Sequence, residues 1–241
     1  MHSEKQTPRR GFRADESTPP RPYFPLPFAP VHLPSRPMGH HHPHLPLPPP
    51  PGDFHAYIFD CDGTLAATMR LHHRSWARAV SLQLGRDFEF PWELFCSMGG
   101  MSTSDTCRRL DERFGFRLDP RRIVHDAESF LDEHLDTVEP VTEVVTLARH
   151  AKDSGLGVAV ASGGYGPHVR RTLKAIGLEH FFPVVTTVEE VKFSKPAPDL
   201  FLLAAQRLRA DPRRCLVIED SPRGREAAEA AGMACLMVEP K

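Results

Sequence analysis

Short apolar runs recur along the chain from residue 56 onward. They cover residues 56–59, 157–161, 184–187, 215–218 and 234–238, with sequences such as AYIF and CLVI. Four or five consecutive apolar residues without alternation are typical of strands that are buried on both faces of a parallel sheet. The pattern therefore predicts five short, buried strands.

Segments with helical periodicity separate the last four runs. They cover residues 166–176, 197–209 and 223–231. Gly177 and Gly232 follow the first and third of them, and Pro196 and Pro198 open the second. Proline near the start of a helix and glycine just past its end is the expected asymmetry. Alternating strands and helices predict an α/β fold with a doubly wound, Rossmann-like parallel sheet.

The interval between the first and second runs breaks this alternation. It contains no strand-like run, but residues 71–84, 91–96, 104–114 and 120–136 have helical patterns. Residues 147–155 have the pattern of a helix that leads back to the sheet. Loop tips at strand ends tolerate insertions. We therefore predict a helical cap at residues 69–139, inserted into a sheet domain formed by residues 53–68 and 140–241.

Residues 1–52 differ from the rest in composition, since 15 of the 25 prolines lie there. Proline fixes φ and lacks a backbone donor, so this segment is expected to be a disordered tail with polyproline II character. The HHHPH sequence at residues 40–44 is compatible with loose metal binding or with an accident of a biased tract. PLPPPP at residues 46–51 is compatible with a spacer or with a ligand for an aromatic groove.

Charge and cysteine content narrow the possible partners. Thirty basic and 31 acidic residues give a formal net charge of -1, which offers no attraction to nucleic acid or to an anionic membrane. No apolar run approaches the roughly 18 residues of a membrane span. The five cysteines form no C-x-x-C pair, so we expect buried free thiols in a reducing, cytoplasmic compartment. Organellar targeting by the tail is a weaker alternative, because Asp15, Glu16 and the prolines interrupt the basic amphipathic pattern that it requires.

Charged and hydroxyl side chains stand where the predicted strands end. Ligands of open parallel sheets bind outside the carboxyl ends of the strands, so these side chains are expected to converge on one rim. Three of the groups directly follow a predicted strand, and a lysine lies in a loop between a strand and a helix. The residues concerned are Asp60 and Asp62, Ser162, Lys195, and Glu219 with Asp220.

These residue types suit phosphoryl transfer. Several carboxylates form the oxygen-rich ligand set that Mg²⁺ prefers, and a carboxylate such as Asp60 can act as a covalent nucleophile. Asp62 points to the same side because strand side chains repeat with a period of two, and it can protonate a leaving oxygen. Lys195 adds a fixed positive charge. Ser162 and the amide of Gly163 can bind phosphate oxygens.

Each feature also has a simpler interpretation. The Asp62–Gly63 pair favours a turn, and a single loop lysine is usually solvated. Glu219 and Asp220 could only cap the helix that follows them. Ser162 could belong to a glycine-rich turn without a ligand. The order of the features, with all of them at strand ends, favours one phosphoryl-transfer site over four unrelated features.

Four segments carry a family resemblance. DCDGTL, VAVASGG, KFSKPAPDLF and VIEDSPRGREAAEAAGM resemble, in this order, the four motifs of the haloacid dehalogenase-like superfamily, and the resemblance covers residues 54–238. The chain is similar to the β-phosphoglucomutase-like branch, which includes sugar-phosphate phosphatases and has a helical cap after the first motif. The resemblance implies a Mg²⁺-dependent phosphatase with a small phosphate ester as its partner, and we expect a monomer.

The resemblance also implies roles for individual residues. Asp60 would be the nucleophile, Asp62 the acid and base, and Lys195 the motif lysine. Thr64 would support the loop, and Ser162 with Gly163 would bind the substrate. The implied metal ligands are Asp60, the backbone carbonyl of Asp62, and Asp220, with Glu219 in contact with the ion or just beyond its ligands. Cys61 and Ser194 depart mildly from the family pattern, and neither removes a functional group.

The choice among reactions depends on the cap. Asp62 excludes the dehalogenase variant, which lacks this acid. Residues 63–140 contain no lysine, which excludes the phosphonatase variant and its cap Schiff base. The resemblance of HHRSW and GGMSTSD to substrate-facing cap segments points to His72, Trp76 and Thr103. Helix packing is the simpler interpretation of His72 and Trp76.

Phosphatase and phosphosugar mutase remain as alternatives. Mutases of this branch carry an arginine where this chain has Thr103, and threonine cannot replace a bidentate phosphate ligand. This favours the phosphatase, although Arg70 or Arg108 could supply the missing cation. A third hypothesis is a catalytically idle interaction protein that recruits partners through its tail, which the complete set of catalytic residues disfavours.

Overall fold

The computed structural model describes residues 45–99 and 101–241. The predicted tail up to residue 44, with its HHHPH sequence, lies outside the described residues. Residues 45–52 form no helix or strand, but Leu45 and Leu47 pack against the larger hydrophobic cluster of the sheet. The packed part of the chain therefore begins before the predicted boundary at residue 53.

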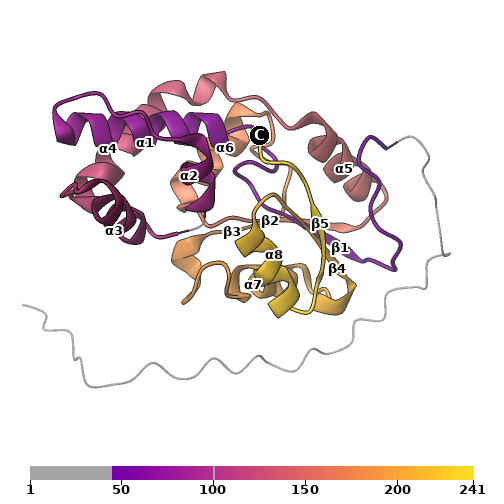
Figure 1. The fold of residues 1–241 in the computed structure, drawn as a ribbon. Coiled ribbons are helices and arrows are strands. Elements are labelled where there is room, and N and C mark those ends of the chain that lie inside the picture. The colour runs from indigo at the N-terminus through magenta and orange to yellow at the C-terminus, as the bar shows by residue number, and fades with distance from the viewer. Residues whose placement is uncertain (1–44, 100) are drawn as a thin grey trace, which may run out of the picture. The chain divides into compact units, whose positions relative to one another are not determined.

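Five parallel strands form the central sheet, as predicted (Figure 1). The order across the sheet is β3-β2-β1-β4-β5. The strands are β1 (Ala56–Phe59), β2 (Gly157–Ala161), β3 (Val184–Thr186), β4 (Cys215–Glu219) and β5 (Ala234–Met237). β1 lies in the middle and pairs with β2 on one side and with β4 on the other. The doubly wound α/β fold class is confirmed.

Alternate side chains of each strand enter two separate hydrophobic clusters. Tyr57 and Phe59 of β1 belong to the larger cluster, whereas Ala56 and Ile58 belong to the second. This division follows from the period of two in a strand, and it explains why the strands are apolar throughout. Helices α5 (Thr142–Asp153) and α6 (Gly166–Ala175) contribute to the first cluster, and α7 (Asp199–Leu208) and α8 (Pro222–Ala230) contribute to the second.

The long interval between β1 and β2 is helical. It contains α1 (Met69–Leu84), α2 (Trp92–Ser97), α3 (Thr103–Phe114), α4 (Pro120–His134) and the short 3-10 helix η1 (Leu135–Thr137). These helices bury a third cluster, which includes Phe90, Leu110 and Ile123. An inserted cap needs an apolar core of its own, and this cluster provides one. The boundaries of the cap at residues 69 and 139 stay a prediction.

Two predictions need correction. α5 begins at Thr142, five residues before the predicted start at 147, because Val144 and Val145 already face the core. The cysteines are all free thiols, but they are not all buried, since Cys96 is exposed and Cys235 is half-buried. No helix among the described residues is long and apolar enough to cross a membrane.

Candidate active site

The strand order places the candidate site at the middle of the sheet. The chain passes from β1 to β2 and β3 on one side, and then returns to β4 and β5 on the other. The connections that leave the carboxyl ends of the neighbouring strands β1 and β4 run to opposite sides of the sheet, and open parallel sheets bind ligands at such a switch point. Asp60 follows β1 directly, and its backbone N–H donates to the carbonyl of Ile218 in β4 at 2.9 Å.

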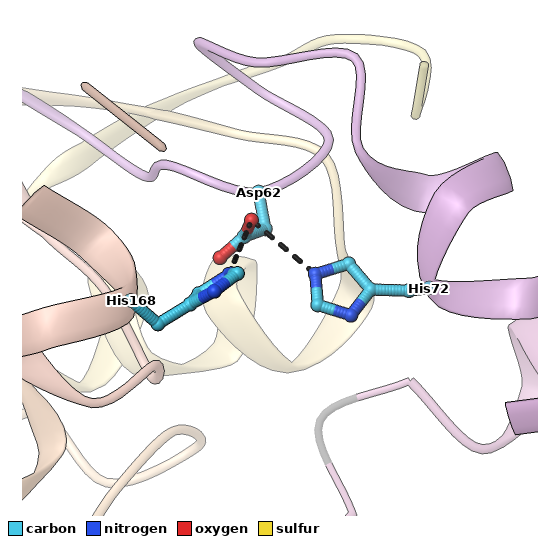
Figure 2. A group of neighbouring side chains, drawn as sticks. All are labelled: Asp62, His72 and His168. Carbon is cyan, nitrogen blue, oxygen red and sulfur yellow. Dashed lines mark hydrogen bonds and ion pairs between the residues drawn. The ribbon is translucent and has the colours of Figure 1, made fainter. Parts of the chain in front are cut away.

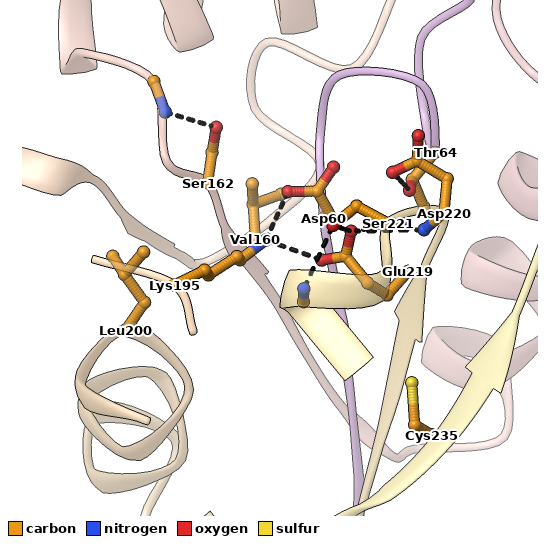
Figure 3. Close-up of polar contacts among 12 residues, drawn as sticks. Asp60, Thr64, Val160, Ser162, Lys195, Leu200, Glu219, Asp220, Ser221 and Cys235 are labelled. Carbon is orange, nitrogen blue, oxygen red and sulfur yellow. Dashed lines mark hydrogen bonds and ion pairs between the residues drawn. The ribbon is translucent and has the colours of Figure 1, made fainter. Parts of the chain in front are cut away.

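Lys195 connects the ends of β1 and β4 (Figure 3). Its Nζ lies 2.5 Å from Asp60 Oδ1 and 2.7 Å from Glu219 Oε2. All three side chains are almost fully buried, with side-chain exposures of 9%, 9% and 1% for Lys195, Asp60 and Glu219. Burial disfavours the ammonium ion, but the charges of the two carboxylates raise the pKa of Lys195 above its usual range. Lys195 is therefore a fixed cation.

Glu219 is held from both sides. Its Oε1 accepts hydrogen bonds from the Ser221 hydroxyl at 2.8 Å and the Ser221 backbone N–H at 3.0 Å. Burial acts to raise the pKa of Glu219, but Lys195 and Ser221 lower it below its ordinary value. A Cβ on Gly224 would lie 1.9 Å from the Glu219 carboxyl carbon, so only glycine fits there. With both oxygens occupied, Glu219 anchors Lys195.

Asp220 lies beside the loop that follows β1. Thr64 is fully buried, and its hydroxyl donates to Asp220 Oδ1 at 3.2 Å. Gly63 has a φ of +84°, which favours glycine, and a Cβ there would lie 2.3 Å from Asp220 Oδ2. The D-x-D-G-T sequence thus forms a turn, as its simpler interpretation predicts, and the same turn contacts Asp220 of the candidate site.

The carboxylates of Asp60, Glu219 and Asp220 form a group suited to a divalent cation. One oxygen from each lies within 4.8 Å of the others, and only one lysine balances their charge. Burial, followed by the charge of Glu219, raises the pKa of Asp60 to about 7, and burial followed by the charge of Asp60 raises the pKa of Asp220 to about 8. Buried carboxylates that also repel one another fit a Mg²⁺ site, because a cation would compensate both the burial and the repulsion.

Asp62 occupies a different environment (Figure 2). Its Oδ1 accepts a hydrogen bond from the Thr68 hydroxyl at 2.9 Å, and the Nε2 atoms of His72 and His168 lie 3.3 and 3.5 Å from the same oxygen. Burial opposes ionisation, but hydrogen bonds from His168 and then His72 hold the pKa of Asp62 well below its usual range. The predicted His72 is therefore in contact with a predicted catalytic residue.

Sequence reasoning missed Thr68 and His168. Thr68 precedes α1 and is nearly fully buried, and His168 lies in the first turn of α6, shortly after the predicted Ser162. A signal for His168 was present, because the segment SGGYGPH connects the end of β2 with a proline-initiated helix. A side chain at such a helix start faces the same rim as Ser162.

The predicted phosphate-binding turn has the expected position. Ser162 is buried directly after β2, and its Oγ accepts a hydrogen bond from the Gly164 N–H at 3.0 Å. A Cβ on Gly164 would lie 3.6 Å from Asp62 Oδ2, and one on Gly163 would lie 3.5 Å from Ser194 Oγ. The turn therefore contacts both the acid segment and the lysine loop.

The remaining cap residues are not gathered at the carboxylates. Trp76 is half-buried against the cap cluster, which agrees with the packing interpretation. Thr103 is half-exposed at the first position of α3. Arg108 pairs with Asp105 at 2.7 Å. Arg70 lies 3.7 Å over the ring of Trp92 and lines a cavity of about 520 Å³.

Comparison with known proteins identifies relatives of this arrangement. A family model of haloacid dehalogenase-like hydrolases matches residues 54–232. Fructose-1-phosphate phosphatase YqaB of Escherichia coli is 34% identical over 178 residues, which cover 73% of this chain and 92% of that protein. The mitochondrial (DL)-glycerol-3-phosphatase 1 of Arabidopsis thaliana is 30% identical over 190 residues, covering 75% and 62% of the two chains.

A solved structure agrees in fold. CbbY from Rhodobacter sphaeroides, in complex with xylulose-(1,5)bisphosphate, superposes with a TM-score of 0.68 and 25% sequence identity. The match covers 78% of this chain and 87% of the CbbY chain.

Proposed function

The chain belongs to the haloacid dehalogenase-like hydrolases and is a phosphatase of that family, and we propose that it hydrolyses a small sugar phosphate through a Mg²⁺-dependent aspartyl-phosphate mechanism. The observation that carries the proposal is the bridge of Lys195 between Asp60 and Glu219, at 2.5 and 2.7 Å. In this proposal Asp60 faces the phosphate, and Glu219, held also by Ser221, anchors Lys195.

Asp60 is the nucleophile in this proposal. Lys195 occupies its Oδ1, and no hydrogen bond to Oδ2 occurs within the described part of the chain, which leaves that oxygen for attack on phosphorus. The new bond joins Asp60 to phosphorus, and the bond between phosphorus and the ester oxygen breaks. Preorganised charge of this kind is an effective catalytic device because it needs no rearrangement during reaction.

Asp62 moves the protons. Because the pKa of Asp62 is lowered before substrate binds, the proton that it donates to the leaving ester oxygen would arrive with the monoanionic phosphate ester. Asp62 then accepts a proton from the water that attacks the aspartyl-phosphate and returns it to the departing phosphate. These two steps return Asp60 and Asp62 to their starting states and release inorganic phosphate. Thr68 holds Asp62 Oδ1 at 2.9 Å, so the other carboxylate oxygen is the one available for the proton.

Asp60 and Asp220 would hold Mg²⁺, together with the backbone carbonyl of Asp62. Glu219 would remain just beyond the ion, because its two oxygens are engaged by Lys195 and Ser221. When bound, Mg²⁺ neutralises charge on the carboxylates and the phosphoryl group. Ser162 and the amide of Gly163 would bind the phosphate oxygens, and His72, which contacts Asp62, would lie close to the leaving group. Trp76 and Thr103 could reach the substrate only from farther out in the cap.

The names of the relatives support a small sugar or polyol phosphate as the substrate, since YqaB is a fructose-1-phosphate phosphatase and the plant relative a glycerol-3-phosphatase. The test is phosphorus NMR of reactions with a panel of hexose, pentose and polyol monophosphates, with and without Mg²⁺. We expect stoichiometric inorganic phosphate from a preferred substrate and no need for a bisphosphate activator. An isomeric sugar phosphate with little inorganic phosphate would instead identify a mutase and implicate Arg70.

A further inference from the structure

The Asp62 cluster has a property that the phosphatase mechanism does not use. The ligand atoms of Asp62, His72 and His168 all lie within 4.8 Å of one another (Figure 2). We propose that these three residues form a second metal site, selective for Zn²⁺ and similar transition-metal ions, whose occupation stops turnover.

The separations within the cluster fit shared coordination. With bond lengths of about 2.0–2.1 Å, two neighbouring ligands of a tetrahedral Zn²⁺ lie roughly 3.3–3.4 Å apart. His72 Nε2 and His168 Nε2 lie 3.3 and 3.5 Å from Asp62 Oδ1. Charge-assisted hydrogen bonds are shorter, about 2.7–2.9 Å. The two distances therefore match the edge of a coordination polyhedron better than strong hydrogen bonds.

The two imidazoles are also oriented for this role. They come from different helices, α1 and α6, and both direct Nε2 at the same carboxylate oxygen. Their ring centroids lie 5.5 Å apart at an interplanar angle of 66°, so the rings do not stack. The side chains of His72, Asp62 and His168 are 23%, 20% and 14% exposed. An ion can thus enter from solvent and keep water as a fourth ligand, as in open zinc sites.

Ligand chemistry separates this site from the neighbouring carboxylates. Mg²⁺ prefers a set of oxygen ligands, which Asp60 and Asp220 would provide together with the backbone carbonyl of Asp62, with Glu219 just beyond them. Two imidazoles and one carboxylate favour borderline-soft ions such as Zn²⁺, Co²⁺ and Ni²⁺. An excess of Mg²⁺ is therefore not expected to displace Zn²⁺ from the histidine site.

The consequence for turnover rests on the proposed function. If Asp62 transfers protons, an ion bound to its carboxylate blocks both proton transfers. Zn²⁺ should then inhibit hydrolysis even with Mg²⁺ in excess, and the inhibition should depend on His168, which neither carries a reacting atom nor binds Mg²⁺ in the proposed mechanism.

The test uses the full chain with His40, His41, His42 and His44 replaced by alanine, because that tract could bind the same ions. Equilibrium dialysis against Zn²⁺ in excess Mg²⁺ is compared with His168→Gln, which keeps a hydrogen-bond donor but not an imidazole. His125→Ala is the control, since its side chain is 83% exposed and remote in sequence from the cluster. His72→Gln is a second variant, and circular dichroism confirms folding.

We expect one tightly bound Zn²⁺ in the parent and in His125→Ala, and at least about tenfold weaker binding in both glutamine variants, by analogy with lost metal contacts. Zn²⁺ inhibition, expressed relative to each variant's own activity, should weaken by the same factor. Equal Zn²⁺ affinity in the parent and both glutamine variants would overturn the site and leave the phosphatase intact. Histidine-dependent Zn²⁺ binding by a chain that hydrolyses no phosphate ester would support the site and overturn the proposed function.

Discussion

Asp60 and Asp62 are separated by one residue, but their surroundings differ in kind. Asp60 forms a buried ion pair with Lys195 at 2.5 Å, and Lys195 also pairs with Glu219 at 2.7 Å. Asp62 is contacted instead by a hydroxyl and two imidazoles at 2.9 to 3.5 Å. Burial and the charge of Glu219 raise the pKa of Asp60 to about 7, whereas the histidines overcome burial and lower the pKa of Asp62.

This difference matches two kinds of task. A nucleophile needs a fixed position and a cation that compensates its charge and that of the phosphate. An acid and base must exchange protons with groups that arrive and leave, so it benefits from partial access to solvent. Opposite pKa shifts in two neighbouring carboxylates mark separate roles, but before metal binds the raised pKa belongs to the proposed nucleophile Asp60 and the lowered pKa to the proposed acid Asp62. A cation on Asp60 would favour its ionised form, which a nucleophile needs. The following predictions test this division.

The largest expected effect separates the two carboxylates directly. Asp60→Asn should lower kcat by at least about 10³-fold, because removal of a nucleophile abolishes the covalent route. Asp62→Asn should still release one equivalent of p-nitrophenolate from p-nitrophenyl phosphate in a rapid burst, since this leaving group needs no proton. Its aspartyl-phosphate should then persist, because the base that activates water is absent. Stopped-flow absorbance measures both reactions.

The matched control is Asp87→Asn, an exposed carboxylate outside the site, which should behave like the parent chain. A burst from Asp60→Asn would contradict the assignment of the nucleophile. No burst and no turnover in a folded Asp62→Asn variant would show that the two acids are not functionally separate.

Lys195→Met should affect both activity and stability. It leaves Asp60 and Glu219 buried without their shared cation, and breaking a buried charge pair costs about 3–5 kcal/mol. We expect a loss of about 3 kcal/mol in the free energy of unfolding at pH 8, with kcat/KM lower by about 10²-fold or more. The stability loss should shrink at pH 5, because the unpaired carboxylates can then bind a proton.

Urea denaturation at the two pH values measures the stability change. Lys174→Met is the control, because that side chain is 69% exposed and lies 3.9 Å from Glu179. An unchanged unfolding free energy in Lys195→Met would mean that the Asp60 region is no more tightly organised than the Asp62 region.

The sequence predicted the Asp60 region better than the Asp62 region, for a physical reason. Asp60, Lys195 and Glu219 each lie at or near the end of a strand-like run, and parallel strand ends converge by geometry alone. The fold followed from the same runs, and β1 and β2 have the predicted bounds. The position of His168 at the start of α6 indicates the same rim, but its contact with Asp62 depends on how α6 is placed and on the direction of the side chain, which no strand end fixes. Long-range helix packing leaves no local periodicity to read.

Removing the metal should change the pH dependence of stability. In the folded chain the pKa values of Asp60 and Asp220 are about 7 and 8, above the unfolded value of 3.8. Proton binding by these two carboxyls therefore stabilises the folded state fully below pH 3.8, and this stabilisation is lost as the pH rises through 7 to 8. Mg²⁺ should remove that loss by binding the ionised carboxylates. The increase in Tm on adding Mg²⁺ should therefore be about 2–4 °C larger at pH 8 than at pH 5.

Differential scanning calorimetry with Mg²⁺ or EDTA measures this difference. The raised pKa of His168 also makes stability fall with rising pH, and it does so both with Mg²⁺ and with EDTA. The difference in Tm between Mg²⁺ and EDTA is therefore the quantity to compare at the two pH values. The lowered pKa values of Asp62 and Glu219 act at more acidic pH, outside this window. Asp220→Asn should abolish the Mg²⁺ effect. An equal Mg²⁺ effect at both pH values would contradict a metal site on these carboxylates.

The smallest expected effect is that of Thr68→Val. The Thr68 hydroxyl is nearly fully buried and makes the shortest contact of Asp62 Oδ1, at 2.9 Å, and valine preserves its shape. Loss of one hydrogen bond to a charged group is worth about 1.5 kcal/mol, so kcat should fall roughly tenfold while KM changes little. Thr146→Val, which removes a hydroxyl bonded to the helix backbone at Thr142, is the control in the same steady-state assay.

A loss as large as that of Lys195→Met would mean that Asp62 is as rigidly constrained as Asp60, and the division between the two carboxylates would fail. An unchanged kcat would mean that the imidazoles of His72 and His168 suffice to orient Asp62.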